Sequence, residues 1–542
     1  LSRLNRGRPV DQPRFSNPSF KPAAVSRVIC HSVTGSGTLE ALCSGSGTLE
    51  AKTATLRMGS PGEPGGSGTL EALCSGTGEA SGNGMLLPED TGQASSILLG
   101  REQQDLPRWH LAALTCFCYP VAGVNSVMGL AIIPREAASL APQYETLFFW
   151  LLWTVVVVAQ LVGPLVGVLS DQLRHEYGRR RPVIATGTLL GVGGALWMWR
   201  SSVNLWPSSF AFGLLLLEMG LVLINVALMS LVSEVCYWRQ LGEASGMIST
   251  AQCGGNLSGV MYALLAGQHA AAYFYPIVIV KLSFACSVVW YLAPDHSSVD
   301  RPPAEPLSWR TFRRAYHIDP VGEVNYFWAF AGCVFFYIAM SIQLFSCFYL
   351  HDLLDEGAQD VLPEQLGYLT LCALGVATLL SYPIGKFSDV VGRLPLIYTA
   401  CLSTAAVYLG YALVLLADSV NARLLSARVL AILYGIAVSC YLSVSFVVAL
   451  ECAPWGRGRG EALGLWCAAG FLGSFVGSIS GTALLAWRGG GSASALTGGL
   501  SGLADVAKSS GYSYDGYIAI LSVGMFTALS SALLTTPVVG VK

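Results

Sequence analysis

The chain contains twelve apolar stretches, each close to the length that a helix needs to cross a lipid bilayer. A bilayer core of about 30 Å requires about 20 residues of helix. Only 12% of the residues are charged, about half the share usual in a soluble protein. We therefore expect an all-α membrane protein with twelve transmembrane helices. The stretches lie at residues 109–133, 144–169, 183–200, 207–232, 245–267, 271–293, 325–350, 365–385, 394–417, 426–450, 461–487 and 514–537.

The spacing of these stretches predicts four regions. Residues 294–324, rich in proline and charge, form a cytoplasmic linker between two six-helix halves at 106–293 and 325–542. Residues 1–105 are rich in Gly, Ser and Thr and repeat the motif GSGTLEALCSG. Such low-complexity sequence buries too little apolar surface to fold, so we expect a disordered tail. The basic segment at its start, 1–28, suits either part of an organellar transit peptide or a cytosolic tail.

Two pairs of motifs show that the halves are repeats of one another. The G-x-x-S-D motif at Gly167–Asp171 recurs at Gly385–Asp389, an offset of 218 in the numbering. The glycine and glutamate residues of Gly242–Gly246 recur at Gly460–Gly464 with the same offset. Repeated halves of this kind place a substrate site near the middle of the membrane, between them.

Basic residues predict the orientation. The loops that follow even-numbered stretches carry most of the Lys and Arg, whereas the loop at residues 351–364 carries none. By the positive-inside rule both termini are cytoplasmic. The net charge of −2 gives no reason to expect a nucleic-acid partner.

The loop after the second stretch carries a family resemblance. It reads SDQLRHEYGRRRP at Ser170–Pro182, and Asp389–Arg393 reads DVVGR in the second half. Both resemble the signature loop of the major facilitator superfamily. The longer first form is similar to that of the sucrose transporters and the related glycoside–pentoside–hexuronide cation symporters. In that branch an acid ending the fourth span precedes several arginines; here Glu234 fits, but only Arg239 follows.

This resemblance, together with the repetition of the loop, predicts a conformational latch between the halves. A carboxylate at a helix end can pair with arginine or cap a neighbouring helix. The alternative is a charge cluster that only fixes topology. The latch residues are Gly167, Asp171, Gly178, Arg179, Arg180, Arg181, Glu234, Gly385, Asp389, Gly392, Arg393 and Glu451.

Polar residues inside the apolar stretches are the candidates for solute binding, because such groups are costly in lipid. Amides suit a hydroxyl-rich solute, although helix–helix hydrogen bonding is the alternative. The candidates are Asn125, Gln160, Asn225, Gln252, Asn256 and Gln343. Asn125 and Gln343 are separated by the repeat offset of 218. Glu218 is a candidate proton carrier, and Lys281 is a second intramembrane charge.

We therefore expect a secondary transporter that moves a small polar solute, a sugar, by proton-coupled alternating access, acting as a monomer in the lipid bilayer. Within transport, the alternative solutes are an organic anion, a drug-like molecule or a lipid. An alternative of another class is a non-transporting membrane sensor or scaffold. No motif indicates an enzyme, a metal or a cofactor.

Overall fold

The computed structural model describes residues 29–30, 39–42, 53–54, 106–266, 270–293, 308–345, 349, 362–414, 419–454, 457–489 and 514–538. The chain forms two compact units, Leu1–Gly92 and Gln93–Lys542. In the first unit, β1 (Ile29–Cys30), β2 (Leu39–Leu42) and β3 (Thr53–Ala54) pair antiparallel in the order β1-β2-β3. The rest of the expected disordered tail lies outside the described residues.

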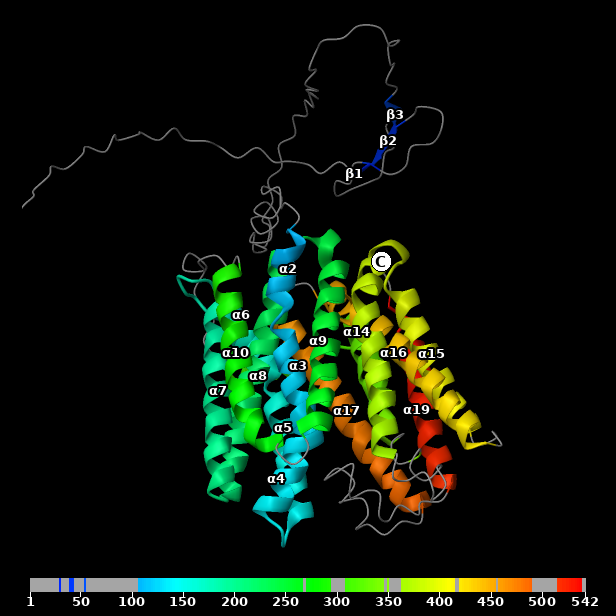
Figure 1. Ribbon diagram of the computed structural model, residues 1–542. Helices are drawn as coiled ribbons and strands as arrows, with labels where there is room; N and C mark the ends of the chain where they lie inside the picture. Colours follow the sequence, from blue (N-terminus) through cyan, green and yellow to red (C-terminus); the bar gives the residue numbers. More distant parts are fainter. Residues whose placement is uncertain are drawn as a thin grey trace, which may run out of the picture. The chain divides into compact units, whose positions relative to one another are not determined.

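The first half of the second unit contains six helical passes (Figure 1). The first pass is interrupted, because a short π-helical segment lies inside it. The second pass breaks at Val162, just before a proline that starts the next helix. The elements are α2 (Arg108–Thr115), α3 (Cys118–Val127), η1 (Met128–Ile132), α4 (Ile133–Leu140), α5 (Glu145–Leu161), α6 (Gly163–Gln172), α7 (Arg181–Val203), α8 (Pro207–Val235), η2 (Trp238–Gln240), α9 (Leu241–Ala266) and α10 (Ala270–Leu292).

The second half follows a short helix in the linker. It contains long, mostly unbroken helices. The helix at Leu362–Val391 has a proline inside it and the helix at Arg459–Gly489 has several glycines. Membrane helices tolerate such residues when neighbouring helices pack around them. The elements are α11 (Trp309–Tyr316), α12 (Val324–Ile342), η4 (Gln343–Phe345), α14 (Leu362–Val391), α15 (Leu394–Val414), α16 (Val420–Glu451), α17 (Arg459–Gly489) and α19 (Tyr514–Leu534).

The all-helical membrane fold is confirmed for the 106–538 region. Among the described residues, 11 helical segments are long and apolar enough to cross a membrane. The twelfth pass is α9, which is 26 residues long but rich in Gly and Ser, and therefore less apolar. In Figure 1 it runs the length of the bundle beside its neighbours.

Helices of the two halves meet along two seams. In one, α6 packs on α17; in the other, α9 packs on α14. A large apolar core joins residues of both halves, and a second cluster lies mainly within the second half. Asp171, in the last turn of α6, and Asp389, in the last turn of α14, lie at the same end of the bundle, which we call the aspartate end. The seams bring together loops that belong to different halves and lie far apart in sequence.

Candidate functional site

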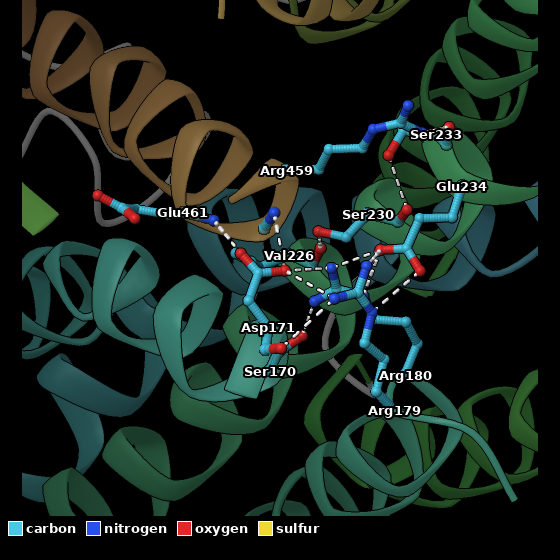
Figure 2. A network of polar contacts seen from close by, with 11 residues as sticks. Ser170, Asp171, Arg179, Arg180, Val226, Ser230, Ser233, Glu234, Arg459 and Glu461 are labelled. Atoms are coloured by element: carbon cyan, nitrogen blue, oxygen red, sulfur yellow. Dashed lines mark hydrogen bonds and ion pairs between the residues drawn. The ribbon is translucent and has the colours of Figure 1, made fainter. Parts of the chain in front are cut away.

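Asp171 lies at the end of α6 and faces the first turn of α17 (Figure 2). Its carboxylate accepts hydrogen bonds from the backbone N–H groups of Gly460, at 3.2 Å, and Glu461, at 3.0 Å. The first N–H groups of a helix have no partner within it, and the helix dipole makes that end positive. A side chain of the first half thus caps a helix of the second half.

A buried arginine completes this arrangement. Arg180 is 0% exposed and lies just before α7. Its guanidinium donates to Asp171 and Ser170 and, at 2.5 Å, to Glu234 at the end of α8. Arg179 holds the same Glu234 through Nε at 3.1 Å and Nη2 at 2.5 Å (Figure 2). The charges compensate one another, as buried ions must.

The second half repeats the arrangement. Asp389 lies against the first turn of α9, whose backbone N–H groups at Gly242 and Glu243 hydrogen-bond to its carboxylate. Arg393 donates to Asp389 at 2.8 Å and lies 3.3 Å from Glu451, at the end of α16. Each half therefore contributes a carboxylate that caps a helix of the other half and an arginine that pairs it with a second acid.

The arginine turns differ between the halves. Gly178 and Gly392 both have positive φ, 93° and 99°, which glycine adopts without strain. Arg393 follows its glycine directly, but in the first half it is Arg180, two positions after Gly178, that bridges Asp171 and Glu234. Arg179 lies 3.9 Å from Asp171, and Arg181 is the partly exposed first residue of α7.

Glycines bring α6 and α17 into direct backbone contact. A methyl group on Gly167 would overlap the carbonyl of Gly460, and one on Gly464 would overlap the carbonyl of Gly163. Both helices carry glycines at i and i+4, the spacing that lets membrane helices approach closely. This close approach lets the short side chain of Asp171 reach the N–H groups of α17.

The second seam uses the same device between α14 and α9. A methyl group on Gly385 would overlap backbone atoms of Gly246. One turn deeper, Ser249 donates to Ser381 at 2.9 Å. Gly242 lies so close to the Asp389 carboxylate that any side chain there would displace it. The two seams are thus related by the same repeat as the sequence motifs.

Two further arginines reinforce the first seam. Arg457 lies 3.4 Å from Glu323, at the start of α12, and 3.5 Å from Glu461. Arg459 donates to the backbone carbonyl of Ser233, at the end of α8 (Figure 2). Helices α12, α17 and α8 are therefore joined at the aspartate end.

Glu218 and Gln160, which the sequence analysis assigned to separate roles, form one buried pair. The Gln160 amide donates to the Glu218 carboxyl at 3.0 Å, and the two residues are 2% and 6% exposed, Glu218 being the more buried. The pair joins α5 and α8 within the first half. Its carboxyl lies in the part of the helix that crosses the membrane.

Three other candidate amides are engaged in contacts between helices. Asn225 of α8 donates to Cys467 of α17 at 3.5 Å. Asn256 of α9 accepts from Ser126 of α3 at 2.8 Å. Gln343 donates to the Tyr411 hydroxyl at 3.5 Å. These positions show the helix–helix hydrogen bonding that was the alternative to solute binding.

Asn125 of α3 and Gln252 of α9 differ from these. Both are partly exposed, and neither amide makes a hydrogen bond to another residue in the described part of the chain. An amide in a membrane helix that leaves its donors and acceptor open is available to a solute or to water.

A small, partly open cavity of about 30 Å³ lies between α3, α9 and α10. Its walls are mainly apolar, with Ser258, Tyr262 and Lys281 as polar members. The Lys281 ammonium lies 5.4 Å from the ring centre of Tyr119, a cation–π contact. The cavity lies within the first half, beside α10.

The family profile described as Major Facilitator Superfamily matches residues 150–456, more than half of the chain. The chain belongs to the major facilitator superfamily. No curated protein sequence matches it. The fold of this facilitator is that of an integral, multi-pass membrane protein, and its family supports secondary transport of a small solute.

Solved structures share the facilitator's fold. One is a bacterial homologue of the iron transporter ferroportin in an outward-facing state, with a TM-score of 0.59 at 11% identity, covering 79% of this chain and 98% of that one. Another is a point mutant of the nucleoside transporter NupG, with a TM-score of 0.51 at 12% identity, covering 80% and 99%. At such identities the likeness extends to the fold alone.

Several buried polar residues of this facilitator were not predicted from the sequence. Ser170 is fully buried and accepts from Arg180; its presence in both G-x-x-S-D motifs was the available signal. Arg457 lies in one of the loops whose basic residues predicted only the orientation. Glu136, 3% exposed, accepts from Ser202 at 2.9 Å and lies 3.5 Å from the Tyr275 hydroxyl. No repeat or motif marked it.

Proposed function

We propose that the structure represents one state of an alternating-access cycle, closed at the aspartate end. This end carries the arginine-rich loops, so the positive-inside rule assigns it to the cytoplasm. The closed end would then be cytoplasmic and the state outward-facing. This assignment rests on the distribution of basic residues and on the contacts that the two halves make with each other in each seam.

The observation that carries the proposal is the exchange of carboxylate caps between halves. Asp171 caps α17 and Asp389 caps α9. Rocking of the halves to open the aspartate end would separate both caps and both glycine seams, whereas each arginine cluster lies within one half and would stay intact. The site therefore has the properties of a latch, a contact set made in one state and lost in the other.

We assign a small polyhydroxylated solute, a sugar, to the space between the halves. The long GRRRP loop, similar to that of the sucrose transporters, and the open amides Asn125 and Gln252 support this choice. The runner-up is another small organic solute. The related structures were described as iron and nucleoside transporters, so these solutes serve as competitors in the test.

We assign proton coupling to Glu218. A carboxyl buried in the membrane is costly when charged and can bind a proton. Gln160 offers its amide N–H to the carboxylate and its carbonyl to the protonated form, because an amide both donates and accepts. The pair can therefore remain hydrogen-bonded in either protonation state.

The test is uptake by the full-length protein reconstituted in liposomes. Labelled sucrose is supplied with and without an inward proton gradient, and with unlabelled sugars, a nucleoside and ferrous iron as competitors. Gradient-driven sucrose uptake that saturates supports the proposal. Uptake of another solute under the same gradient would support transport and leave the latch proposal standing, but it would contradict the assignment of a sugar as the solute. If no solute enters sealed liposomes that contain correctly folded protein, the transport proposal is contradicted, and the alternative of a non-transporting membrane sensor or scaffold is favoured.

A further inference from the structure

Helix α11, with the sequence WRTFRRAY, is a short amphipathic helix in the linker between the halves. Its residues separate into three faces at helical spacing. Ala315 and Thr311 face the protein, and Ala315 is fully buried. The other two faces are one of aromatic residues, Trp309, Phe312 and Tyr316, and one of basic residues, Arg310, Arg313 and Arg314.

The aromatic face is open. Trp309, Phe312 and Tyr316 are 75%, 38% and 37% exposed. Their rings form a continuous row: Trp309 stacks on Phe312 with centroids 4.9 Å apart, and Phe312 lies 5.3 Å from Tyr316. Aromatic rings in such a row are typical of the boundary between lipid headgroups and acyl chains.

The basic face is also exposed to solvent, with Arg314 at its edge near Glu461. Arg310, Arg313 and Arg314 are all exposed, and the helix contains no acidic residue. Because the aromatic and basic faces adjoin, a membrane surface can meet both at once, with the rings in its apolar part and the guanidinium groups among its phosphates.

Local contacts fix the helix in place. Ser308 caps its first turn through the Thr311 N–H at 3.3 Å. The Tyr316 hydroxyl donates to the Leu161 carbonyl, at the end of α5, at 2.7 Å. Helix α11 also packs on α6 and α17. It is therefore a positioned element at the side of two helices whose termini meet at Asp171.

We propose that α11 is an interfacial helix that binds anionic phospholipid. The guanidinium groups of Arg310 and Arg313, beside a row of aromatic rings, match the charge and the layered polarity of an anionic leaflet. A zwitterionic leaflet would satisfy the rings but not the arginines. Binding of this kind needs no transported solute.

A chain of contacts leads from α11 to the proposed latch. The carbonyl of His317, the residue after α11, accepts from Arg457 at 2.5 Å. Arg457 lies 3.5 Å from Glu461, whose N–H is capped by Asp171. Lipid that holds α11 against the bundle therefore favours the closed aspartate end. This consequence rests on the proposed function, whereas lipid binding itself does not.

The binding test uses full-length protein and short-chain phosphatidylserine or phosphatidylcholine as probes, in a mild detergent. The test variant is Arg310→Gln/Arg313→Gln, which leaves Arg314 near Glu461. The matched control is Arg174→Gln/Arg239→Gln, which removes the same charge from two other exposed positions at the same end. We expect the parent to prefer phosphatidylserine, the test variant to bind it about thirtyfold more weakly, and the control to match the parent.

Trp309→Ala supplies a second variant, which should weaken binding of both lipids because it removes the apolar contact. Equal affinity of the parent for both lipids, or an equal loss in the control, would overturn the proposal. So would tight binding of polyglutamate without preference for phosphatidylserine, which would indicate an acidic protein partner.

A conformational measurement separates this inference from the proposed function. Spin-label distances across the aspartate end are compared in phosphatidylserine and phosphatidylcholine nanodiscs, without solute. We expect more of the closed distance with phosphatidylserine, and no lipid effect in the test variant. If the spin-label distances are the same in both lipids while sucrose uptake persists, only the proposed link between lipid binding and the latch is contradicted. Failed uptake with intact lipid selectivity would contradict only the transport proposal.

Discussion

Asp171 acts on two partners at once, the open N–H groups of α17 and the buried Arg180. In Asp171→Asn, the amide oxygen can still accept from one N–H group, but the N–H groups of α17, which only the closed state brings to this position, no longer meet a charged acceptor. Hydrogen bonds to charged groups contribute about 2 kcal/mol, so the ratio of closed to open molecules should fall about thirtyfold. Spin-label distances across the aspartate end measure this ratio. Asp319→Asn, in the exposed linker, is the control, and an unchanged distance distribution in Asp171→Asn would rule out the latch.

Glu218→Gln tests proton coupling by replacing one carboxyl oxygen with an NH₂ group. The glutamine has almost the same shape and can still hydrogen-bond to Gln160, so we expect a folded protein with normal solute binding. It cannot exchange a proton, so uptake should no longer respond to an inward proton gradient, while exchange of solute across the membrane continues. The measurement is uptake with and without the gradient in proteoliposomes. A gradient response equal to that of the parent would make the pair structural.

At the scale of elements, the close approach of the helices in each seam predicts how alanine substitutions of glycine change the stability of the closed end. Gly167→Ala places a methyl group against the Gly460 carbonyl and Gly385→Ala places one against Gly246. Each should separate its helices and destabilise the closed end by about 1 to 3 kcal/mol, as overpacking does. Gly193 of α7 and Gly375 of α14 have no atom within 4 Å of such a methyl group. Alanine there should be neutral or stabilising by up to about 1 kcal/mol.

Thermal unfolding in detergent and the same spin-label distances would measure both sets of variants. Equal behaviour of Gly385→Ala and Gly375→Ala, which lie in the same helix, would show that the seam does not control closure.

Apolar length predicted the helices well because a bilayer imposes the same requirement on every pass. The repeated motifs likewise marked the two aspartates that contact a helix of the other half; their role in gating stays a prediction. The partner of Asp171 was harder to predict. The first-half loop is longer, and the arginine that hydrogen-bonds to the Asp171 carboxylate is Arg180, not Arg179, which directly follows Gly178. The Gln160–Glu218 pair joins two separate helices, and nothing local in the sequence links them. Helix α11 was predicted only as a source of positive charge, because so short a helix gives a weak periodic signal.

At the scale of the whole molecule, the two latches should act on one equilibrium. Asp171 and Asp389 lie in different seams and share no contact, and distant sites contribute additively to free energy. We therefore expect the shift in closed-state free energy of Asp171→Asn/Asp389→Asn to equal the sum of the two single shifts, measured from the same spin-label distances. If each single variant opened only its own seam and left the other closed, the seams would move independently and the single equilibrium would be ruled out.

The composition of α9 has a consequence for how the chain is made. Its glycines and serines are what allow α14 to approach so closely, but they make α9 less apolar than the other passes, which lowers its tendency to enter lipid alone. We therefore expect the translocon to retain α9 until a more apolar neighbour, α8 or α10, has emerged to accompany it. The seam that closes the transporter thus imposes an order on its own biosynthesis.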